Sequence, residues 1–230
     1  MTKRTVRVGL CGLGTVGQGV LALLAEGNAA ISARSAAHLV VTHVGTRTPR
    51  PEVDIGNAQD SRDVFAVAHD PEVDVLIELI GGTTVAKELV IAALQQKKHV
   101  ITANKALLAD HGGELFSLAE QQGVSLKYEA AVAGGIPIIE TVRASLAANE
   151  VTSVAGIING TGNFILTAMA SEGRAFDDVL QEAQRLGYAE ADPTFDVDGT
   201  DAAQKLVYWR PWLLVRRFLR MRRLSKVSTA

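Results

Sequence analysis

The chain has 230 residues, 47% of them hydrophobic, which is sufficient for a sizeable buried core. Its single cysteine, Cys11, excludes an intramolecular disulfide and favours a reducing compartment. The formal net charge is −2, but seven of the 23 basic residues lie at or beyond Arg210, where no acidic residue occurs. The first 209 residues are therefore acidic, which argues against nucleic acid as a partner.

Membrane association is also not expected. No apolar run approaches the roughly 18–20 residues of a membrane-spanning helix. The apolar run after Arg4 is interrupted by Gly9, Gly12 and Gly14, unlike the continuous core of a signal peptide. We therefore expect a cytoplasmic protein.

Strand-like apolar runs alternate with helical patterns over residues 1–135, which is typical of a parallel sheet covered by helices on both faces. The runs are nearly continuous, as in strands buried on both faces, and predict strands at Thr5–Cys11, His38–Gly45, Val73–Ile80, His99–Thr102 and Val124–Ala130. Helices are predicted between them, near Val16–Glu26, Ala86–Gln96 and Gly113–Gln121. The predicted fold class is α/β, with a Rossmann-type doubly wound parallel sheet.

The pattern becomes less regular after residue 135. Pro137 suits the first position of a helix within Ile136–Ala147. A strand is predicted at Val151–Ile158, and helices are predicted near Gly162–Ser171 and Phe176–Leu186.

A G-x-G-x-x-G motif follows the first predicted strand and precedes the first predicted helix. Gly12 permits a tight turn, Gly14 lets the backbone approach a pyrophosphate, and Gly17 allows close packing of helix against strand. Phosphate oxygens would bind the amides around Thr15 and Val16 at the helix N-terminus. The motif in this position predicts a dinucleotide site, the alternative being a purely structural turn.

The end of the second predicted strand bears on the choice of cofactor. An acidic residue there would bind the ribose 2′-hydroxyl of NAD, but the sequence offers Thr46 and Arg47, with Arg50 behind them. Arg47 suits a 2′-phosphate and favours NADP, whereas the alternative is a solvated loop arginine.

Two further segments lie where ligands bind in doubly wound folds. Glu78 ends a buried strand and is followed by a turn opening at Gly81, a position that faces the nicotinamide half of such a cofactor. Asn104 and Lys105 follow the next strand, and Lys105 is expected to be functional.

The segment 190–205 is rich in carboxylates. Its ionisable residues include five carboxylates and one lysine: Glu190, Asp192, Asp196, Asp198, Asp201 and Lys205. Carboxylates so close together repel one another unless a cation or an amine is nearby. Asp201 and Lys205 share one face if a helix begins at Thr200 or Asp201. The alternative is a solvated acidic loop that ends in an ordinary ion pair within a helix.

Two features that the sequence lacks reduce the range of reactions that it could catalyse. Cys11 lies next to the glycine turn, where we expect it to pack as a small hydrophobic residue and not to act as a nucleophile. The five histidines form no metal-ligand pattern. What remains is hydride transfer in which a lysine handles the proton and carboxylates hold a cationic group of the substrate.

Five segments together resemble the homoserine dehydrogenase family, from about residue 5 to about residue 207. They are "GLGTVG", "TANKALLA", "YEAAVAGGIPIIE", "GIINGTGNFIL" and "GYAEADPTFDVDGTDAAQKL". The resemblance implies NAD(P)H-dependent interconversion of L-aspartate 4-semialdehyde and L-homoserine, on the route to threonine, methionine and isoleucine. It also implies a nucleotide-binding domain, a dimerisation region and an α/β substrate domain, and hence a homodimer.

The resemblance assigns roles residue by residue. Lys205 would be the proton donor and acceptor, Asp201 the second catalytic carboxylate, and Glu190 a substrate ligand. Lys105 would lie near both nicotinamide and substrate, and Gly187 would contact the cofactor through its backbone. Asn159, Gly160, Thr161 and Asn163 would line the substrate side. Glu129, with the carbonyl groups of Val132, Gly134 and Ile136, resembles the family's monovalent cation site, usually sodium, whose oxygen shell carries little charge.

The family pattern stops after Leu206. Pro211 should end or kink the helix that carries Lys205, and the basic tail that follows resembles out-of-frame sequence. We therefore expect a Rossmann domain at 1–135, an incomplete α/β dimerisation and substrate domain at 136–207, and an atypical tail at 208–230. A rival interpretation of the tail is a basic amphipathic helix that binds anionic lipid.

Three functions follow as hypotheses. The first is homoserine dehydrogenase. The second is a catalytically impaired nucleotide-binding fragment of that enzyme. The third is another NADP-dependent oxidoreductase acting on an amino-acid-like substrate.

Overall fold

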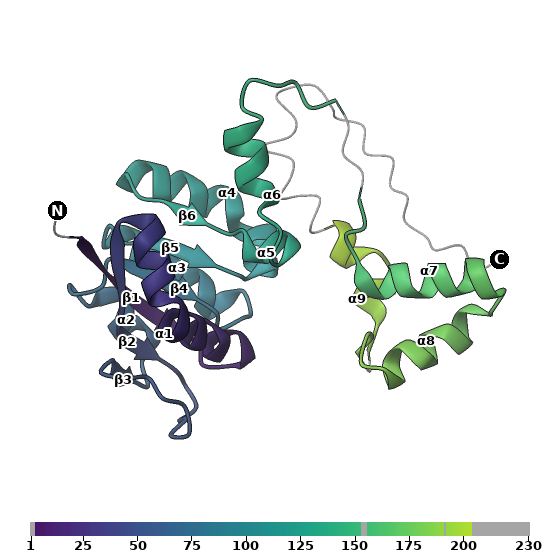
Figure 1. Ribbon diagram of the computed structural model, residues 1–230, viewed down its shortest axis with the longest axis horizontal. Helices are drawn as coiled ribbons and strands as arrows, with labels where there is room; N and C mark the ends of the chain where they lie inside the picture. The colour runs from purple at the N-terminus through teal and green to yellow at the C-terminus, as the bar shows by residue number, and fades with distance from the viewer. Residues whose placement is uncertain (1–2, 153–155, 191, 204–230) are drawn as a thin grey trace. The chain divides into compact units, whose positions relative to one another are not determined.

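A computed structural model describes residues 3–152, 156–190 and 192–203 of the chain (Figure 1). The chain divides into two compact units, Met1–Gly135 and Ile136–Ala230. No helix in the described part of either unit is long and apolar enough to cross a membrane.

The first unit is built on a six-stranded parallel sheet with strand order β3-β2-β1-β4-β5-β6. Its strands are β1 (Arg4–Cys11), β2 (Ala37–Gly45), β3 (Gln59–Ser61), β4 (Val75–Glu78), β5 (His99–Thr102) and β6 (Leu126–Lys127). This is the order of a doubly wound dinucleotide-binding sheet, so the predicted fold class is confirmed. The order reverses between β1 and β4, and ligands of such sheets bind outside the strand ends at that point.

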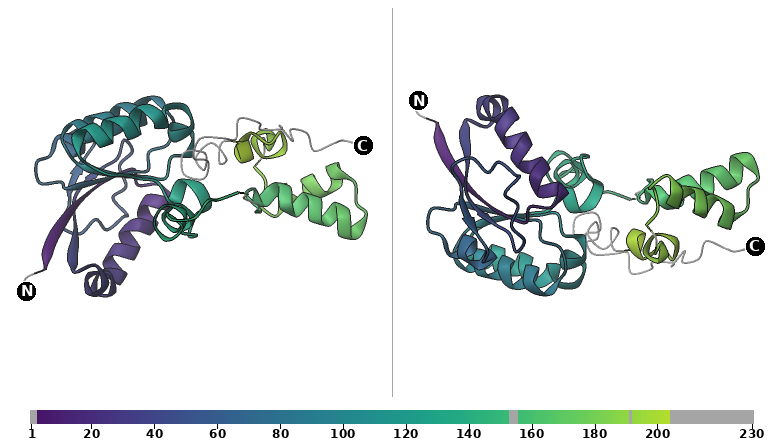
Figure 2. Two further views of the ribbon diagram at one scale, coloured as in Figure 1. Left: turned by 90° about the horizontal axis from the view of Figure 1, so that it is seen from above. Right: turned by 90° about the horizontal axis from the view of Figure 1, so that it is seen from below.

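Helices cover the two faces of this sheet unequally. Figure 2 shows α1 on one face and α3 and α4 on the other. The helices of the first unit are α1 (Thr15–Ser35), α2 (Val64–His69), α3 (Thr84–Gln95), α4 (Lys105–Gln122) and α5 (Ala130–Ala133). Under α1, Leu21 packs with Leu10, Leu13 and Val44 in one buried cluster.

The expectation that every strand is buried on both faces is wrong for β5. Val100 and Thr102 are fully buried, but Ile101 between them is 39% exposed. The reason is that α1 packs against β2, whereas α3 covers the opposite face of β5. Burial therefore alternates along β5, although its sequence is continuously apolar at Val100 and Ile101.

The predicted strands β1, β2 and β5 agree with the structure to within one residue. The strand predicted at Val73–Ile80 is shorter, and the one predicted at Val124–Ala130 is reduced to two residues because Ala130 begins α5. The elements β3 and α2 were not predicted. Their three and six residues are too short for a periodic pattern to emerge.

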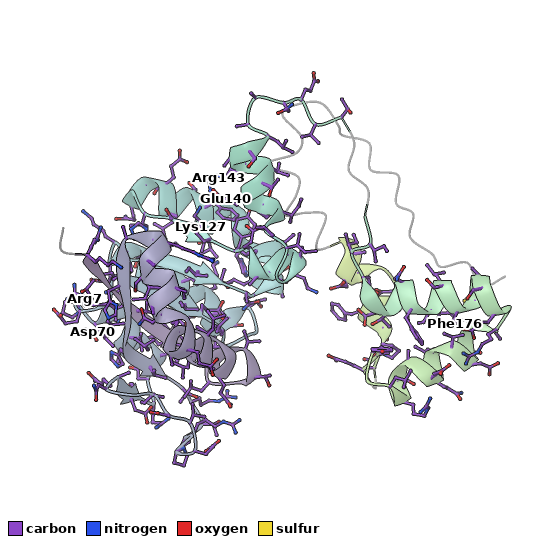
Figure 3. The ribbon with its side chains drawn as sticks, viewed as in Figure 1. Arg7, Asp70, Lys127, Glu140, Arg143 and Phe176 are labelled. Carbon is purple, nitrogen blue, oxygen red and sulfur yellow. The ribbon has the colours of Figure 1, made fainter. Side chains whose placement is uncertain are left out.

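An ion pair joins the two central strands near their amino ends. Arg7 of β1 donates from Nε and Nη2 to the two carboxylate oxygens of Asp74, at 3.2 and 3.1 Å, and its backbone amide donates to the same group. The amide of Asp74 returns a bond to the carbonyl of Arg7. Arg7, which is labelled in Figure 3, also pairs with Glu72. These contacts fix β4 beside β1, which defines the point where the strand order reverses.

The second unit is helical in its described part. It contains α6 (Ile138–Glu140), a π-helical turn η1 (Thr141–Ser145), α7 (Gly160–Glu172), α8 (Phe176–Arg185) and α9 (Thr194–Val197), and residues 200–203 are also helical. Ile165 and Ala168 of α7 pack against Val179 of α8, and Phe176 adds its ring to this cluster (Figure 3).

Two predictions for this unit need correction. Pro137 lies one residue before the helix rather than at its first position, because its ψ of 58° is not helical. The strand predicted at Val151–Ile158 is wrong at 151–152 and 156–158, which are irregular, while 153–155 lie outside the described residues. The described part of this unit contains no other strand with which that segment could pair.

The Arg7–Asp74 pair predicts a pH dependence of stability. The hydrogen bonds from Arg7 lower the pKa of Asp74 from its usual 3.8, against the opposing effect of burial. A lowered carboxylate pKa stabilises the folded chain above pH 3.8, and this contribution is lost as the pH falls through the folded-state pKa. Asp74→Asn should therefore reduce the free energy of unfolding at pH 7 and make its acid-side decline shallower, as measured by urea denaturation across pH. Glu88→Gln, at an exposed position of α3, is the control, and an unchanged slope in Asp74→Asn would contradict the assignment.

Candidate functional site

The glycine turn after β1 is held by backbone contacts that leave no room for side chains. The amide of Gly12 donates to the carbonyl of Gly45 at 2.8 Å, and Gly12 has a φ of 108°. A Cβ on Gly12 would lie 2.6 Å from the carbonyl oxygen of Leu79, and one on Gly17 would lie 2.0 Å from the carbonyl oxygen of Gly12. Both positions thus require glycine for steric reasons within the fold.

Gly14 differs from these two glycines. A Cβ there would meet nothing within 4 Å, and Gly14 is the N-cap of α1 without a side-chain cap. The following residues, Thr15 and Val16, are exposed at the first turn of the helix. The open space lies at a helix N-terminus, where backbone amides and the helix dipole favour an anion. The residues present therefore fit the pyrophosphate of a dinucleotide.

Two arginines lie near the end of β2. Arg47 is exposed two residues beyond the strand. Arg62, which the sequence analysis did not assign, donates from Nη1 to the carbonyl of Thr46 at 3.1 Å. Arg62 follows β3, and only the pairing of β3 with β2 shows that it belongs beside Thr46. Arg62 is also paired with Asp60, whereas Arg47 is exposed at the strand end where the ribose of an adenosine half would lie.

The ends of β4 and β5 carry the other predicted cofactor residues. Glu78 is fully buried at the end of β4, and Lys105 is half-buried as the first residue of α4. Asn104 is the N-cap of α4, with its Oδ1 accepting from the amide of Leu107 at 3.1 Å. Both strand ends lie at the same edge of the sheet as the glycine turn, because all the strands are parallel.

Cys11 is fully buried at the end of β1. Burial raises the pKa of its thiol, and the nearby Glu78 raises it further. The thiolate is the nucleophilic form of cysteine, so this thiol is inert, as the sequence analysis expected.

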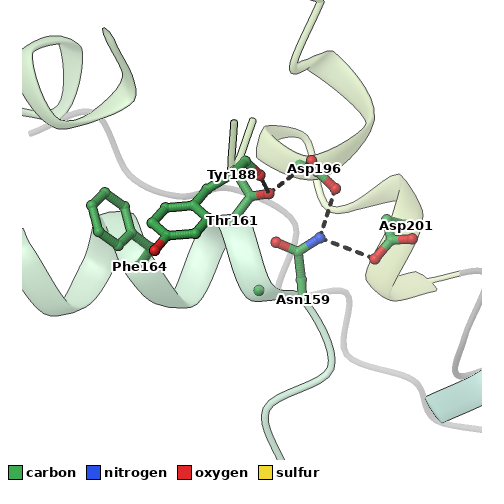
Figure 4. Close-up of a pocket in the computed structure, with 7 residues that line it drawn as sticks. Asn159, Thr161, Phe164, Tyr188, Asp196 and Asp201 are labelled. Atoms are coloured by element: carbon green, nitrogen blue, oxygen red, sulfur yellow. Dashed lines mark hydrogen bonds between the residues drawn. The ribbon is translucent and has the colours of Figure 1, made fainter. Parts of the chain in front are cut away.

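In the second unit, Asn159 joins two carboxylates. As the N-cap of α7 it accepts from the amide of Gly162 through Oδ1 at 2.5 Å. Its Nδ2 donates to Asp196 at 2.8 Å and to Asp201 at 3.0 Å (Figure 4). Both protons and the oxygen of the amide are therefore engaged, which fixes its orientation.

These groups line a pocket of about 500 Å³, together with Gly160, Thr161, Phe164 and Tyr188. The Thr161 hydroxyl lies 2.7 Å from the carbonyl oxygen of Tyr188 and 3.0 Å from the carboxylate of Asp196. The rings of Phe164 and Tyr188 pack 5.1 Å apart, centre to centre. One part of the pocket is thus acidic and another aromatic (Figure 4).

The residues of this unit that were predicted to bind substrate or to act in catalysis differ in their burial and in their contacts. Asp201 is buried on the helical segment 200–203, whereas Glu190 is exposed and is not among the described residues that line the pocket. Asn159 contacts the carboxylates of Asp196 and Asp201, and Thr161 contacts that of Asp196. Lys205 lies outside the described residues.

Asp196 belongs to the pocket but was not assigned a role from sequence. It is one of several carboxylates in its segment, and spacing alone did not distinguish it from Asp192 or Asp198. Gly187 was predicted to contact the cofactor. Its φ of 77° occurs where the chain leaves α8, and its amide donates to the carbonyl of Gln184 at 3.1 Å.

Three residues of the predicted cation site belong to the first unit and one belongs to the second. Glu129 is the half-buried N-cap of α5, Val132 is buried within that helix, and Gly134 follows it with a φ of 58°. Ile136 is exposed at the start of the second unit, and its carbonyl accepts from the amide of Ile138 at 2.8 Å.

Two models of known protein families match this chain, one in each unit. Residues 12–129 match the family model described as the NAD-binding domain of homoserine dehydrogenase. Residues 137–215 match the model described as homoserine dehydrogenase. The chain belongs to the homoserine dehydrogenase family. The chain therefore belongs to a family of oxidoreductases, and its first unit is a nicotinamide-cofactor-binding domain.

Individual homoserine dehydrogenases are similar over most of this chain. The protein from Pseudomonas aeruginosa is 54% identical over 203 residues, which cover 88% of this chain and 47% of the relative. The structure of a homoserine dehydrogenase from Thiobacillus denitrificans superposes with a TM-score of 0.86 at 48% identity, covering 92% of this chain and 49% of that one. A hyperthermophilic archaeal homoserine dehydrogenase, solved in complex with NADPH, has a TM-score of 0.74 at 26% identity and covers 89% of this chain and 69% of that one. The chain spans about half the length of the curated relatives it matches.

Single substitutions should separate the roles of the glycines in α1 and the turn before it. Gly17→Ala should destabilise the chain by roughly 1–3 kcal/mol, since its Cβ meets the Gly12 carbonyl, and should also weaken NADPH binding. Gly14→Ala should lower the thermal unfolding temperature less than Gly17→Ala does, since the only cost is a poorer N-cap, but it should weaken NADPH binding because its Cβ occupies the open space before α1. Gly19→Ala, also in open space but within the helix, is the control and should stabilise by about 0.5–1 kcal/mol. Thermal unfolding and NADPH fluorescence titration measure these effects; unchanged binding in Gly14→Ala would argue against the pyrophosphate assignment.

Proposed function

We propose that this chain carries the catalytic machinery of an NADP-dependent homoserine dehydrogenase. The reaction is the interconversion of L-aspartate 4-semialdehyde and L-homoserine, on the route to threonine, methionine and isoleucine. The family membership carries this proposal. The glycine turn of the first unit and the acidic pocket of the second provide its physical basis.

The first unit would hold the cofactor. The amides at Thr15 and Val16 would bind the pyrophosphate, and Arg47 would bind the 2′-phosphate of NADP, with Arg62 nearby. Lys105 would contact the nicotinamide side, and Gly187 of the second unit is proposed as a further backbone contact. When bound, the cofactor supplies the hydride for the aldehyde carbon.

The second unit would bind the amino-acid part of the substrate. The ammonium group of aspartate semialdehyde suits the carboxylates of its pocket, and Glu190 is proposed as a further ligand. Asn159 and Thr161 would act by holding Asp196 and Asp201 in place. Fixing these groups before binding lowers the entropic cost of orienting the substrate.

Lys205 would handle the proton. Lys205 follows Asp201 by four residues in the sequence, a spacing at which two residues of a helix share one face. A carboxylate beside a lysine favours its ammonium form. That form can protonate the alkoxide that develops when the aldehyde is reduced.

We further propose a monovalent cation, best matched by sodium, bound by Glu129 and the carbonyl groups of Val132, Gly134 and Ile136. A single carboxylate with neutral oxygens suits an ion of low charge. The resemblance to the family supports this site, and it also supports a homodimer.

Cofactor preference can be tested at Arg47. Arg47→Ala should weaken NADPH binding about tenfold, since one charge-assisted hydrogen bond contributes about 1.5 kcal/mol. NADH, which lacks the 2′-phosphate, should bind with unchanged affinity. Arg50→Ala is the control, because Arg50 is paired with Glu52 at 3.5 Å. Equal losses for NADPH and NADH in Arg47→Ala would show that this arginine does not read the 2′-phosphate.

The reaction itself can be tested at Lys205. NADPH oxidation by the purified chain should depend on L-aspartate 4-semialdehyde, and Lys205→Ala should lower kcat by about 10²–10⁴-fold, the contribution of a positioned proton donor. NADPH binding should persist in this variant. Lys87→Ala, which removes a lysine of α3 paired with Glu114, is the matched control.

Two outcomes would overturn the proposal. NADPH binding without turnover above that of Lys205→Ala would identify the chain as a nucleotide-binding fragment. Turnover with a different amino-acid-like aldehyde, but not with aspartate semialdehyde, would identify another oxidoreductase.

A further inference from the structure

A fully buried carboxylate lies beneath the loop that follows β4. Glu78 has no exposed surface, and its side chain makes three hydrogen bonds. Oε1 accepts from the amides of Ile80 at 2.9 Å and Gly81 at 3.3 Å. Oε2 accepts from the Thr102 hydroxyl at 2.5 Å. The carboxylate therefore connects its own loop to the neighbouring strand β5.

The connection continues from Thr102 to the start of α4. The Thr102 hydroxyl accepts from the amide of Asn104 at 2.9 Å. Asn104 in turn donates from Nδ2 to the carbonyl of Gly82 at 2.6 Å and caps α4 through Leu107. The contacts thus form a closed circuit from Glu78 through β5 and back to the loop after β4.

This circuit fixes the backbone of residues 79–82. Leu79 is held by its amide, which donates to the carbonyl of Cys11 at 2.8 Å. Gly81 and Gly82 have φ values of 72° and 69°, a backbone shape that side chains disfavour. The loop is therefore fixed on one side by β1 and on the other by the turn that begins α4.

The fixed loop lies on the opposite side of the pyrophosphate turn from Arg47. In a doubly wound sheet the two halves of a dinucleotide extend to either side of the reversal point. An adenosine half would bind on the β2 side, and a nicotinamide half would bind on the side of β4 and β5.

We propose that Glu78 and Thr102 are positioning residues for the nicotinamide half of the cofactor. They do so by fixing the loop 79–82 and the first turn of α4, where Lys105 lies. This inference rests on the proposed function, because it requires a nicotinamide dinucleotide. A loop fixed before binding does not have to be ordered by the ligand, which improves affinity for the group it contacts.

The test compares NADPH with 2′-phospho-ADP-ribose, which has the adenosine half and the pyrophosphate but no nicotinamide. Thr102→Val in the full chain removes the hydroxyl that joins Glu78 to Asn104. It should weaken NADPH binding about tenfold, as expected for losing a hydrogen bond to a charged group. Binding of the fragment should stay unchanged. NADPH fluorescence and isothermal titration calorimetry measure the two dissociation constants.

Two variants control for general effects on the fold. Thr102→Ser keeps the hydroxyl and should restore the affinity for NADPH. Thr42→Val removes a hydroxyl that has no hydrogen-bond partner among the described residues, so it should leave both ligands unaffected. If Thr102→Val does not fold, Glu78→Gln provides the same comparison, since it keeps the shape of the side chain but not its charge.

The outcomes separate this inference from the proposed function. Equal affinities of Thr102→Val and the original chain for NADPH, or equal losses for NADPH and the fragment, would overturn the inference. Failure of the original chain to bind NADPH would overturn the inference together with the proposed cofactor. Normal NADPH binding without turnover of aspartate semialdehyde would count against the proposed function alone.

Discussion

The close approach of α1 to the turn that precedes it determines the geometry of the first unit. The Gly17 position leaves 2.0 Å between an added Cβ and the carbonyl oxygen of Gly12, so the helix can begin directly above the end of β1. Gly12 also packs against the carbonyl of Leu79 and donates to Gly45. One turn therefore contacts the ends of both neighbouring strands, and the helix N-terminus is placed at the point where the strand order reverses.

Much of this unit was predictable because its signals are local. Strands β1, β2 and β5 are continuous apolar runs, and the spacing of Gly12, Gly14 and Gly17 identifies the turn. The short elements β3 and α2 were missed because each depends on pairing with distant residues. The exposure of Ile101 was missed for the same reason, since burial on the second face of β5 depends on which helix covers it.

The candidate sites show the same limit. Sequence patterns located the acidic segment and Asp201, but not the part that Asp196 plays. That residue belongs to the pocket because Asn159 reaches it from α7 across a separation of 37 residues. Arg62 likewise reaches Thr46 only because β3 pairs with β2. Residue type and spacing predict which groups are available, whereas long-range contacts determine which of them meet.

The two units use a similar arrangement at the N-terminus of one helix. In each, a polar side chain at a helix N-cap also fixes groups from another segment: Asn104 holds the carbonyl of Gly82, and Asn159 holds Asp196 and Asp201. An asparagine suits this task because its oxygen caps the helix while its amide group still donates two hydrogen bonds.

Burial of Glu78 is costly unless its charge is compensated, so the position is informative about what the fold requires. An apolar residue at the same place would fill the space, but it would leave the amides of Ile80 and Gly81 without their acceptor. A neutral amide could accept from those two groups, but its nitrogen would then face the Thr102 hydroxyl, whose proton would lose its acceptor. The carboxylate alone accepts at both oxygens, so it satisfies the loop and the strand together. The interaction that fixes the loop is therefore also the one that makes the buried charge tolerable.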